Sequence, residues 1–552
     1  MLIDALTILD DSLIVCDICI VGAGAAGITL AREFINQPEQ VCLLESGGFE
    51  HEETTQNLYT GKNIGDAYFP LKETRSRSFG GTTNLWGGWS RPLDDIDFQD
   101  RPWMNYSSWP ITKAELIPYY ERAQEVSGLG PFAYDFSNWQ DKLSNLGCQR
   151  PNFDEDIETN IWQIIPSNRL RFGKVYQTEL EQAKNVTTYL HANVLDIETN
   201  DSATEVQQLR VGCLNGKKFT VQAKIFILAV GGIENPRLLL ASNQVQKNGL
   251  GNQHDLVGRF FMEHPYLNSG KIYFAQPPIL YTQQKIKIDQ TFLATGLGLS
   301  EKRQEQEQVL NFSARLFSVL PDWVKAINSL KYKLQRKNKA IHQAFPSITE
   351  ICQHKSNTSA LEDLKTIITN LDQVSARAYN KLFNKSFYAG PSNSYETHLI
   401  AEQEPNPDSR ITLSSERDQL GMNQTQLDWR LSSLDKYTIK RSQQILADEL
   451  ARSGLGQLEI EESDEIWSKV EASYHHMGTT RMSLNPKQGV VDENCLVHGI
   501  SNLYVAGCSV FPTSGLSNPT LTIMALAIRL ADHLKTKATQ PVNLTPQHLL
   551  HI

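Results

Sequence analysis

The feature that most constrains the fold of this chain is a glycine turn close to its N-terminus. Residues 18–21 are apolar, residues 22–27 read Gly-Ala-Gly-Ala-Ala-Gly, and apolar side chains recur at helical spacing from Ile28 to Ile35. In such a turn the first glycine permits the tight bend, the second lets the backbone approach a diphosphate, and the third lets the helix pack closely. The pattern predicts the strand, turn and helix of a dinucleotide-binding unit.

A second apolar run, at 41–44, ends in Glu45, which lies 23 residues after Gly22. An acid at the end of the second strand of a βαβ unit can accept hydrogen bonds from an adenosine ribose. A glycine turn alone also occurs without a ligand. Here strand, turn, helix, second strand and acid follow in the order that a dinucleotide site requires, so we expect a Rossmann-type domain.

A third candidate strand, at 225–230, is followed by two glycines and then by Pro236, which stands near the expected first position of a helix. Residues 502–507 resemble a last buried strand. Residues 519–534 are rich in apolar side chains and lack interior glycine or proline, as in a long helix. The first domain is therefore predicted to be discontinuous, at 1–265 and 462–540.

Between 266 and 461 the composition shifts to longer polar stretches mixed with alternating strands such as 396–402. This shift predicts a separate substrate-binding domain, and residues 541–552 are predicted to form a C-terminal tail. The expected fold class is α/β, with a discontinuous Rossmann-type domain and an α+β substrate-binding domain that contains an antiparallel sheet.

A basic amphipathic helix is expected near 323–339. Trp323, Ile327, Leu330 and Leu334 share one face, and lysines and arginines crowd the remainder. Such a helix could contact a membrane surface or an acidic electron-transfer partner. It could also pack its apolar stripe on the domain with its charges in solvent, and this second interpretation is favoured.

Composition excludes several classes of protein. The net charge of −10, with both signs spread along the chain, argues against a nucleic-acid-binding surface. Eight scattered cysteines indicate reduced thiols, and the Cys16-x-x-Cys19 pair fits a buried strand better than a redox motif. The N-terminus lacks the pattern of a signal peptide, and no apolar run reaches the ~18 residues that span a bilayer. We expect a cytoplasmic protein without a transmembrane segment.

Three further clusters contain residues suited to cofactor binding or catalysis. They read Phe-Gly-Gly-Thr-Thr-Asn-Leu-Trp-Gly-Gly-Trp at 79–89, Tyr-His-His-Met-Gly-Thr-Thr-Arg-Met at 474–482, and Pro-Thr-Ser-Gly-Leu-Ser-Asn-Pro-Thr-Leu-Thr at 512–522. The glycines and small hydroxyl residues of the first cluster would let backbone amides lie against a planar ring or a diphosphate. The histidines of the second titrate in the range that suits a general base.

Together with the glycine turn, these clusters resemble the glucose-methanol-choline (GMC) oxidoreductases. The Asn-Pro-Thr-Leu-Thr segment is most similar to the pyranose oxidase and sugar dehydrogenase branches of that family. The resemblance runs from about Asp17 to His533, with little similarity in the middle of the chain. It implies an FAD-dependent oxidoreductase that oxidises a CH–OH group.

The resemblance also implies the roles of individual residues. The family's catalytic base falls on His475, with His476 as the competing assignment, and the family's second His-or-Asn position falls on Asn518. Oxidation of CH–OH requires removal of the hydroxyl proton while a hydride leaves the carbon, and an imidazole beside an amide suits both needs. Two adjacent histidines also fit one buried structural residue and one exposed residue. Asn518 before Pro519 is in addition a good helix N-cap.

The cofactor contacts implied by the resemblance fall into four groups. These are Gly22, Gly24, Ala25, Gly27 and Glu45 at the ADP part, Val194 at the adenine, Gly81, Thr82, Thr83, Asn84 and Trp86 at the flavin, and Ala229, Gly231, Gly507, Cys508, Asn518, Pro519 and Thr520 along the remainder. Leu85 stands where members with covalent flavin carry histidine, so the FAD is expected to be bound non-covalently. Gly507 stands where many members of the family carry an acid. We expect no metal site.

The function expected from these residues is oxidation of a sugar, glycoside or polyol to a carbonyl compound. The electron acceptor is left open between oxygen, a quinone and a separate redox protein. Because the chain contains no Cys-x-x-Cys-His haem motif, any cytochrome would be a separate chain. The alternative is a non-redox flavin-containing lyase or decarboxylase of the same fold. A flavin-binding scaffold without activity is a third hypothesis, which His475 and Asn518 disfavour.

Overall fold

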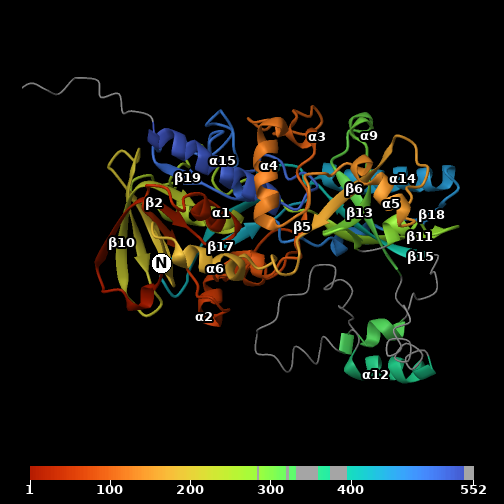
Figure 1. Ribbon diagram of the computed structural model, residues 1–552, viewed down its shortest axis with the longest axis horizontal. Helices are drawn as coiled ribbons and strands as arrows, with labels where there is room; N and C mark the ends of the chain where they lie inside the picture. Colours follow the sequence, from red (N-terminus) through yellow and green to blue (C-terminus); the bar gives the residue numbers. More distant parts are fainter. Residues whose placement is uncertain (283–284, 319–321, 328, 331–358, 373–393, 540–552) are drawn as a thin grey trace, which may run out of the picture.

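The computed structural model describes residues 1–552 apart from 283–284, 319–321, 328, 331–358, 373–393 and 540–552. Its described part forms two lobes side by side, each built around a large β-sheet (Figure 1). Each lobe has an extensive buried apolar core. This is the α/β arrangement that the sequence predicts.

The sheet of the first lobe has eight strands in the order β1-β7-β3-β2-β10-β9-β8, with β19 paired to β10. Its central strands are parallel, whereas β9 is antiparallel to both β10 and β8. The strands span β1 Leu2–Asp4, β2 Ser12–Val21, β3 Val41–Leu44, β7 Val186–Leu190, β8 Asn193–Thr199, β9 Val206–Gly212, β10 Lys218–Leu228 and β19 Leu503–Val505.

The predicted βαβ unit is confirmed. β3 has the predicted bounds, and its parallel register with β2 pairs Val21 with Leu44. Because both strands end at the same edge of the sheet, the glycine turn after β2 and Glu45 after β3 lie next to each other. Strand β19 begins at Leu503 and pairs with β10, which ends at Leu228, so the Rossmann-type sheet is discontinuous in sequence.

Helices cover the first sheet on the side seen at the top of Figure 1. Helix α1 packs against α15 and α6, and α15 also packs against α4. The principal helices of this lobe span α1 Ala25–Glu33, α4 Lys113–Ser127, α6 Phe172–Gln182, α7 Gly231–Ala241 and α15 Thr520–Thr539.

Two helix starts differ from the prediction. Helix α7 begins at Gly231, so Pro236 lies inside the helix and not at its first position. A proline there leaves the carbonyl four residues earlier without its usual donor, and the Thr479 hydroxyl donates to that Gly232 carbonyl at 2.6 Å. Helix α15 begins at Thr520, and the Pro519 carbonyl accepts the amide of Ile523, which places Asn518 one residue before the cap.

The sheet of the second lobe has the order β18-β11-β15-β14-β13-β6-β5, with β12 paired to β13, and its pairings are antiparallel. Its strands span β5 Trp89–Ser90, β6 Ile157–Ile164, β11 Tyr266–Phe274, β12 Ile286–Ile288, β13 Thr291–Leu299, β14 Phe312–Ser318, β15 Ser394–Ala401 and β18 Gly456–Glu459. Helix α14 (Ser433–Arg452) packs against β14, β15 and β18.

The pairing of β5 and β6 differs from the predicted division of the chain. Both strands lie within 1–265, yet β6 pairs along its whole length with β13 of the second sheet. Strands pair through backbone hydrogen bonds regardless of their separation in sequence. A composition shift near 266 therefore does not reveal that β5 and β6 belong to the second sheet. The division at 265 and 461 remains a proposal for the rest of the chain.

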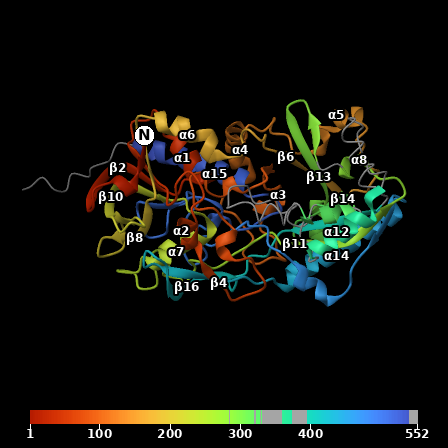
Figure 2. The same cartoon turned by 90° about the horizontal axis from the view of Figure 1, so that it is seen from below.

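The remaining elements are shorter, and the arrangement is also seen from below in Figure 2. A three-stranded sheet joins β4 Gly61–Asn63, β16 Arg410–Arg417 and β17 Asn423–Asp428. Short helices span α2 Glu53–Gln56, α3 Asp95–Phe98, α5 Gln140–Asn145, α8 Ile279–Thr282, α9 Glu301–Glu307 and α12 Ala360–Thr369.

The expected basic helix near 323–339 lies largely outside the described residues. Residues 322–327 and 329–330 are helical, whereas 331–339, like the predicted tail at 541–552, belong to segments that the structure does not describe. Among the described residues, we find no helix with the length and apolar character needed to cross a membrane. Cys16 and Cys19 both lie on β2 and are free thiols.

Candidate active site

A large cavity opens at the carboxyl ends of the parallel strands, where the first lobe meets the second. Its walls include residues that follow β2, β3 and β10, the N-terminal end of α15, and side chains of the second sheet. It contains every predicted site residue except Gly27 and Asn84, namely Gly22, Gly24, Ala25, Glu45, Gly81, Thr82, Thr83, Trp86, Val194, Ala229, Gly231, His475, Gly507, Cys508, Asn518, Pro519 and Thr520.

Two positions of the turn require glycine because neighbouring backbone atoms lie too close for a Cβ. Gly22 has a φ of +100°, and a Cβ there would lie 2.7 Å from the Ala229 carbonyl oxygen. A Cβ on Gly27 would lie 1.8 Å from the carbonyl oxygen of Gly22, so Gly27 permits close packing of α1 and does not line the cavity. A Cβ on Gly24 would meet no described atom within 4 Å, because it would point into the cavity.

Glu45 ties the glycine turn to the end of β3. Its Oε2 accepts the amide of Ala23 and its Oε1 accepts the amide of Gly47, both at 2.9 Å. These two charge-assisted bonds hold the buried carboxylate at the cavity wall. Val194 of β8 lies in the same wall, at the predicted adenine end.

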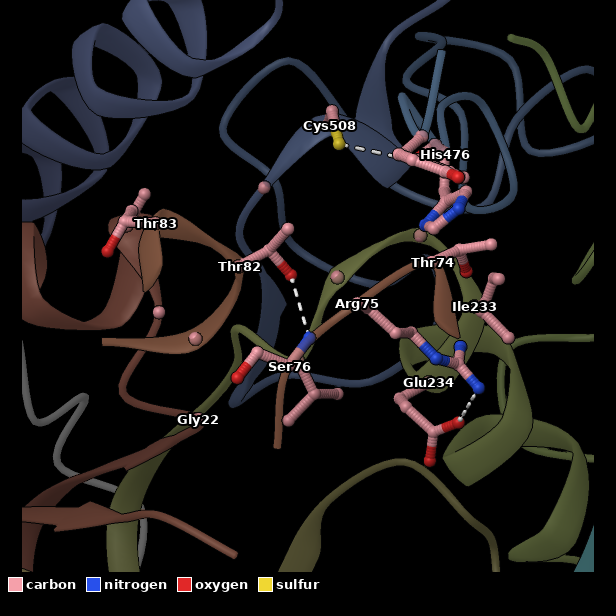
Figure 3. Close-up of a pocket in the computed structure, with 18 of the residues that line it drawn as sticks. Gly22, Thr74, Arg75, Ser76, Thr82, Thr83, Ile233, Glu234, His476 and Cys508 are labelled. Carbon is pink, nitrogen blue, oxygen red and sulfur yellow. Dashed lines mark hydrogen bonds and ion pairs between the residues drawn. The ribbon is translucent and has the colours of Figure 1, made fainter. Parts of the chain in front are cut away.

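The loop at 76–84 forms another wall. The Ser76 amide donates to the Thr82 hydroxyl at 3.4 Å, as Figure 3 shows, and the Thr83 hydroxyl donates to the Gly80 carbonyl at 2.6 Å. Asn84 faces away from the cavity, because its amide donates to the Ser78 hydroxyl at 3.0 Å and to the Phe79 carbonyl at 2.9 Å. Asn84 therefore closes the loop that presents Gly81 and Thr82.

A buried arginine cluster lines the cavity and was not predicted. Glu234 lies 3.1 Å from Arg75, 3.6 Å from Arg77 and 3.1 Å from Arg237, and Figure 3 shows the first of these pairs. Arg237 also pairs with Asp418 at 2.7 Å. Within the described part of the chain, Nε and Nη1 of Arg75 and Arg77 have no hydrogen-bond partner. The cluster joins three guanidinium groups to two carboxylates, and of these five side chains Arg75, Arg77 and Glu234 line the cavity.

His475 and Asn518 meet at the cavity, as the resemblance implies. The Asn518 side-chain nitrogen lies 3.4 Å from His475 Nε2, although the two residues are 43 positions apart. The other ring nitrogen of His475, Nδ1, faces away from Asn518 and lies 2.8 Å from Nδ1 of His264. The structure thus brings the predicted base and its amide partner together and adds a second histidine behind the base.

His476 has different surroundings. Its ring packs against Phe261 and Tyr68, and its backbone carbonyl accepts a hydrogen bond from the Cys508 thiol at 3.1 Å (Figure 3). Its Nε2 lies 3.7 Å from Glu263 and has no hydrogen-bond partner among the described residues. Both histidines line the cavity, but Asn518 lies beside the ring of His475.

Glu263 anchors the backbone that carries both histidines. Its Oε2 accepts the amides of His475 at 2.8 Å and Ser473 at 3.2 Å, and Tyr68 donates to its other oxygen. An isolated bridge between Met262 and Met477 adds backbone bonds at 3.0 Å in both directions. The segments at 262–266 and 471–477 therefore form one frame.

Burial determines the protonation states in this frame. It lowers the pKa of His475 well below its usual 6.5, and His264, His476 and Arg315 nearby lower it further. Burial also lowers the pKa of His264 to about 4 and that of His476 to about 3. It raises the pKa of Glu263 to about 7. At neutral pH all three imidazoles are neutral, and His475 can accept a proton.

The cavity fits FAD. Gly24, Gly231 and Gly507 each have open space where a Cβ would stand, so the backbone there can approach a ligand closely. Within the described residues no side chain caps the N-terminus of α1, and the unpaired donors of Arg75 and Arg77 add positive charge suited to a diphosphate. The N-terminal end of α15 also faces the cavity, which favours negative charge there.

Replacing Gly24 by valine tests this fit. Gly24 has an ordinary φ of −84°, and its Cβ position is open, so we expect the apoprotein to keep its unfolding temperature. The new side chain would occupy the space beside the N-terminus of α1, and we expect FAD affinity to fall at least about tenfold, or ~1.4 kcal/mol. Flavin content after purification and titration of apoprotein with FAD measure the effect. An unchanged affinity would contradict the placement of the cofactor.

A Rossmann-type sheet, a cavity that fits FAD and a histidine beside an asparagine define the class as FAD-dependent oxidoreductases that act on CH–OH donors. Comparison with known proteins agrees. Residues 405–527 match the family model described as GMC oxidoreductase. Over this C-terminal segment the chain is similar to the GMC oxidoreductases.

Relatives match over nearly the whole chain. The chain is 22% identical to the fructose dehydrogenase large subunit of Gluconobacter japonicus, over 94% of this chain and 97% of the relative. It is 23% identical to 2-methyl-1,2-propanediol dehydrogenase of Mycolicibacterium austroafricanum, over 96% of each. The structure of pyridoxine 4-oxidase from Mesorbium loti aligns with a TM-score of 0.53 at 17% identity, over 94% of this chain and 99% of that one. This structural likeness supports the fold.

Sequence reasoning missed several residues of the cavity wall. Arg75, Arg77 and Glu234 stand outside the glycine motifs, and Tyr266, Arg315 and Ile400 come from strands of the second sheet. His264 also stands outside the motifs of the sequence analysis, in the segment Met-Glu-His-Pro at 262–265. The signal available for it in the sequence was the neighbouring Glu263, an acid that directly follows the apolar residues 260–262.

Proposed function

We propose that this protein oxidises a CH–OH group of a sugar, glycoside or related polyol to a carbonyl group. His475 removes the hydroxyl proton at its Nε2, and the Asn518 amide holds the same oxygen. FAD, when bound, supplies the acceptor for the hydride at flavin N5. The contact of Asn518 with His475 Nε2 at 3.4 Å, in the wall of the cavity, is the observation that carries this proposal.

The residues around the pair support its proposed role. His475 is neutral at pH 7, because burial lowers its pKa, so its free nitrogen can accept a proton. The frame around Glu263 fixes its backbone, which limits the positions that the ring can adopt. Tyr266, Arg315 and Trp89 line the cavity from the second lobe and would contact the remainder of a polar substrate.

The substrate class is inferred from the relatives and the chemistry of the wall. The two relatives named above act, by their names, on fructose and on a propanediol, and both compounds carry more than one hydroxyl group. We also propose a cytoplasmic location and non-covalent FAD, which rest on the free thiols and on Leu85 at the cavity wall.

Anaerobic mixing of the purified holoenzyme with a panel of sugars, glycosides and polyols tests the proposal. We expect loss of the oxidised flavin absorbance near ~450 nm with one class of compound and no loss in the His475→Ala variant. A flavin that stays oxidised with every compound would favour the non-redox alternative, in which the fold acts as a lyase or decarboxylase.

Replacing Asn518 by alanine removes the donor that we assign to the substrate oxygen. We expect kcat to fall by about 10²–10³-fold, the range for loss of one donor at a developing oxyanion. Asn518→Asp should be at least as impaired, because its carboxylate repels the negative charge on the oxygen. Steady-state kinetics with the substrate found above measure both variants. A variant that raises KM alone would show a binding role in place of the proposed one.

The pH dependence of kcat/KM follows from the lowered pKa of His475. The base works only when neutral, so activity is lost as the pH falls through its pKa. Because this pKa lies well below 6.5, we expect the acid limb of the profile to lie below pH 6.5. His264, His476, Arg315 and Glu263 surround His475, and Glu263→Gln separates the ionisation of Glu263, whose pKa is about 7, from that of the base. An acid limb above pH 6.5 in both proteins would contradict the assignment.

A further inference from the structure

The side chain directly behind the proposed base is His264. Its Nδ1 lies 2.8 Å from Nδ1 of His475, and its Nε2 lies 3.3 Å from the backbone carbonyl oxygen of Ser514. The side chain is completely buried. The two imidazole rings lie nearly perpendicular, at 80°, with centroids 4.9 Å apart. A chain of contacts therefore runs from a backbone carbonyl through His264 to His475 and on to Asn518.

The proton positions along this chain follow from its first member. A carbonyl oxygen only accepts hydrogen bonds, so Nε2 of His264 must carry the hydrogen. His264 is neutral at pH 7, since burial lowers its pKa to about 4, so its Nδ1 has a free lone pair. That lone pair can only accept, and Nδ1 of His475 must donate to it. Neutral His475 is then left with a lone pair on Nε2, the nitrogen beside Asn518.

We propose that His264 is a positioning residue that fixes the tautomer of His475, so that Nε2 of His475 is the free nitrogen facing the substrate. This inference deepens the proposed function and rests on it for the role of His475. The Ser514 carbonyl sets the direction of the chain. Moving the hydrogen of His264 to Nδ1 would leave a buried lone pair facing the Ser514 oxygen and would point the moved hydrogen at the hydrogen on His475 Nδ1.

The frame of the site also holds His264 in place. The Ser473 hydroxyl donates to the His264 backbone carbonyl at 2.9 Å, and Glu263 binds the amides of Ser473 and His475. The two rings are thus attached to the same pair of backbone segments. When His475 takes a proton at Nε2, its Nδ1 hydrogen still points at the His264 lone pair, so the contact persists through the proton transfer.

A neutral partner has a different effect from a carboxylate. A carboxylate behind an imidazole both orients it and raises its pKa, because it stabilises the charged form. His264 orients the ring without a compensating negative charge, so His475 retains the low pKa that burial gives it. This combination provides a base that stays neutral well below pH 6.5 and has one defined free nitrogen.

Nitrogen NMR of the holoenzyme labelled with ¹⁵N-histidine tests the tautomer directly. The chain has 13 histidines, and the His475 signals are identified by their loss in His475→Ala. We expect a protonated Nδ1 and an unprotonated Nε2 on His475 at pH 7. A proton on Nε2 of His475 in the wild-type protein would overturn the proposal, whatever the enzyme oxidises. The expected tautomer in a protein that oxidises no alcohol would instead refute the proposed function alone.

Variants of His264 test its role in turnover. His264→Phe keeps the bulk of the ring but removes the acceptor, and we expect both tautomers of His475 in the spectrum. We expect kcat to fall by about 10–100-fold, the range for loss of a partner that orients a functional imidazole. His264→Asn can present its side-chain oxygen to Nδ1 of His475 and should retain most of the activity. His498→Asn is the matched control, because His498 also contacts a backbone carbonyl, that of Ser483 at 2.9 Å, and does not line the cavity.

The variants distinguish a positioning role from a structural one. Equal losses in His264→Phe and His264→Asn, with one tautomer of His475 retained in both, would overturn the proposal. If His264→Phe does not retain FAD, the wild-type spectrum and His264→Asn still decide the question. Recovery of both the single tautomer and the rate in His264→Asn supports it.

Discussion

Replacing His475 by alanine is expected to lower kcat by about 10²–10⁴-fold while the protein retains FAD. The reason is that His475 lies at the cavity wall with its Nε2 beside Asn518. Among the described residues, no other titratable side chain has this position. His475 does not line the predicted ADP end, so cofactor affinity should change little. Stopped-flow reduction of the flavin under anaerobic conditions measures the chemical step separately from reoxidation.

Two comparisons make this result specific. His476→Gln should lose much less activity, because its Nε2 faces Glu263 at 3.7 Å and its ring packs against Phe261. Added imidazole should partly restore the rate of His475→Ala, since it can occupy the space of the deleted ring and accept a proton. A larger loss in His476→Gln than in His475→Ala, with FAD retained in both, would transfer the role of base to His476.

The cofactor half of the site could be predicted because local sequence determines it. Within the turn, Gly22 has a φ of +100° and a Cβ on Gly27 would lie 1.8 Å from the Gly22 carbonyl oxygen, so local backbone geometry favours glycine at both positions. Glu45 follows a strand whose register with β2 follows from two apolar runs. His475 and Asn518 were found by resemblance to a family. Their contact at 3.4 Å depends on tertiary structure that no spacing reveals.

The parts that could not be predicted involve pairs distant in sequence. Strand β6 joins a sheet in which every strand except β5 lies more than 100 residues later in the chain, and only the completed sheet shows that β6 pairs with β13. The position of His264 behind His475 depends on the bridge between Met262 and Met477. Likewise, the hydroxyl of Thr479 supplies the donor that permits Pro236 inside α7, which a local rule for proline excludes.

A second large effect is expected at the buried ion pair between Arg101 and Glu402. Two hydrogen bonds, at 2.7 and 2.6 Å, join the guanidinium to the carboxylate, and the side chains are 1% and 0% exposed. Arg101 follows α3, whereas Glu402 follows β15 and also accepts the amide of Asn311 at 3.1 Å. The pair therefore connects the segment that follows α3 to the second sheet. The next residue, Gln403, donates its amide to the Ser514 hydroxyl at 3.1 Å.

Arg101→Met should lower the free energy of unfolding by about 3–5 kcal/mol, because it leaves a carboxylate buried without its partner. Burial, together with the negative charge of Glu402, raises the pKa of the neighbouring Asp97 well above its usual range, so Asp97 offers no positive charge that could replace Arg101. Denaturant unfolding followed by tryptophan fluorescence, in the apo and FAD-bound forms, measures the loss. The deficit should shrink at lower pH, since the unpaired carboxylate can then bind a proton.

The double variant Arg101→Met with Glu402→Leu separates the loss of the attraction from the cost of an unpaired charge. Replacing both partners by apolar side chains removes the buried charge altogether, and such replacements are often neutral or stabilising. We therefore expect the double variant to be more stable than Arg101→Met alone, which a double-mutant cycle measures as coupling between the two positions. If the two single losses simply add, the pair does not act as a unit. The connection between the lobes would then depend on the packing around it and not on the charges.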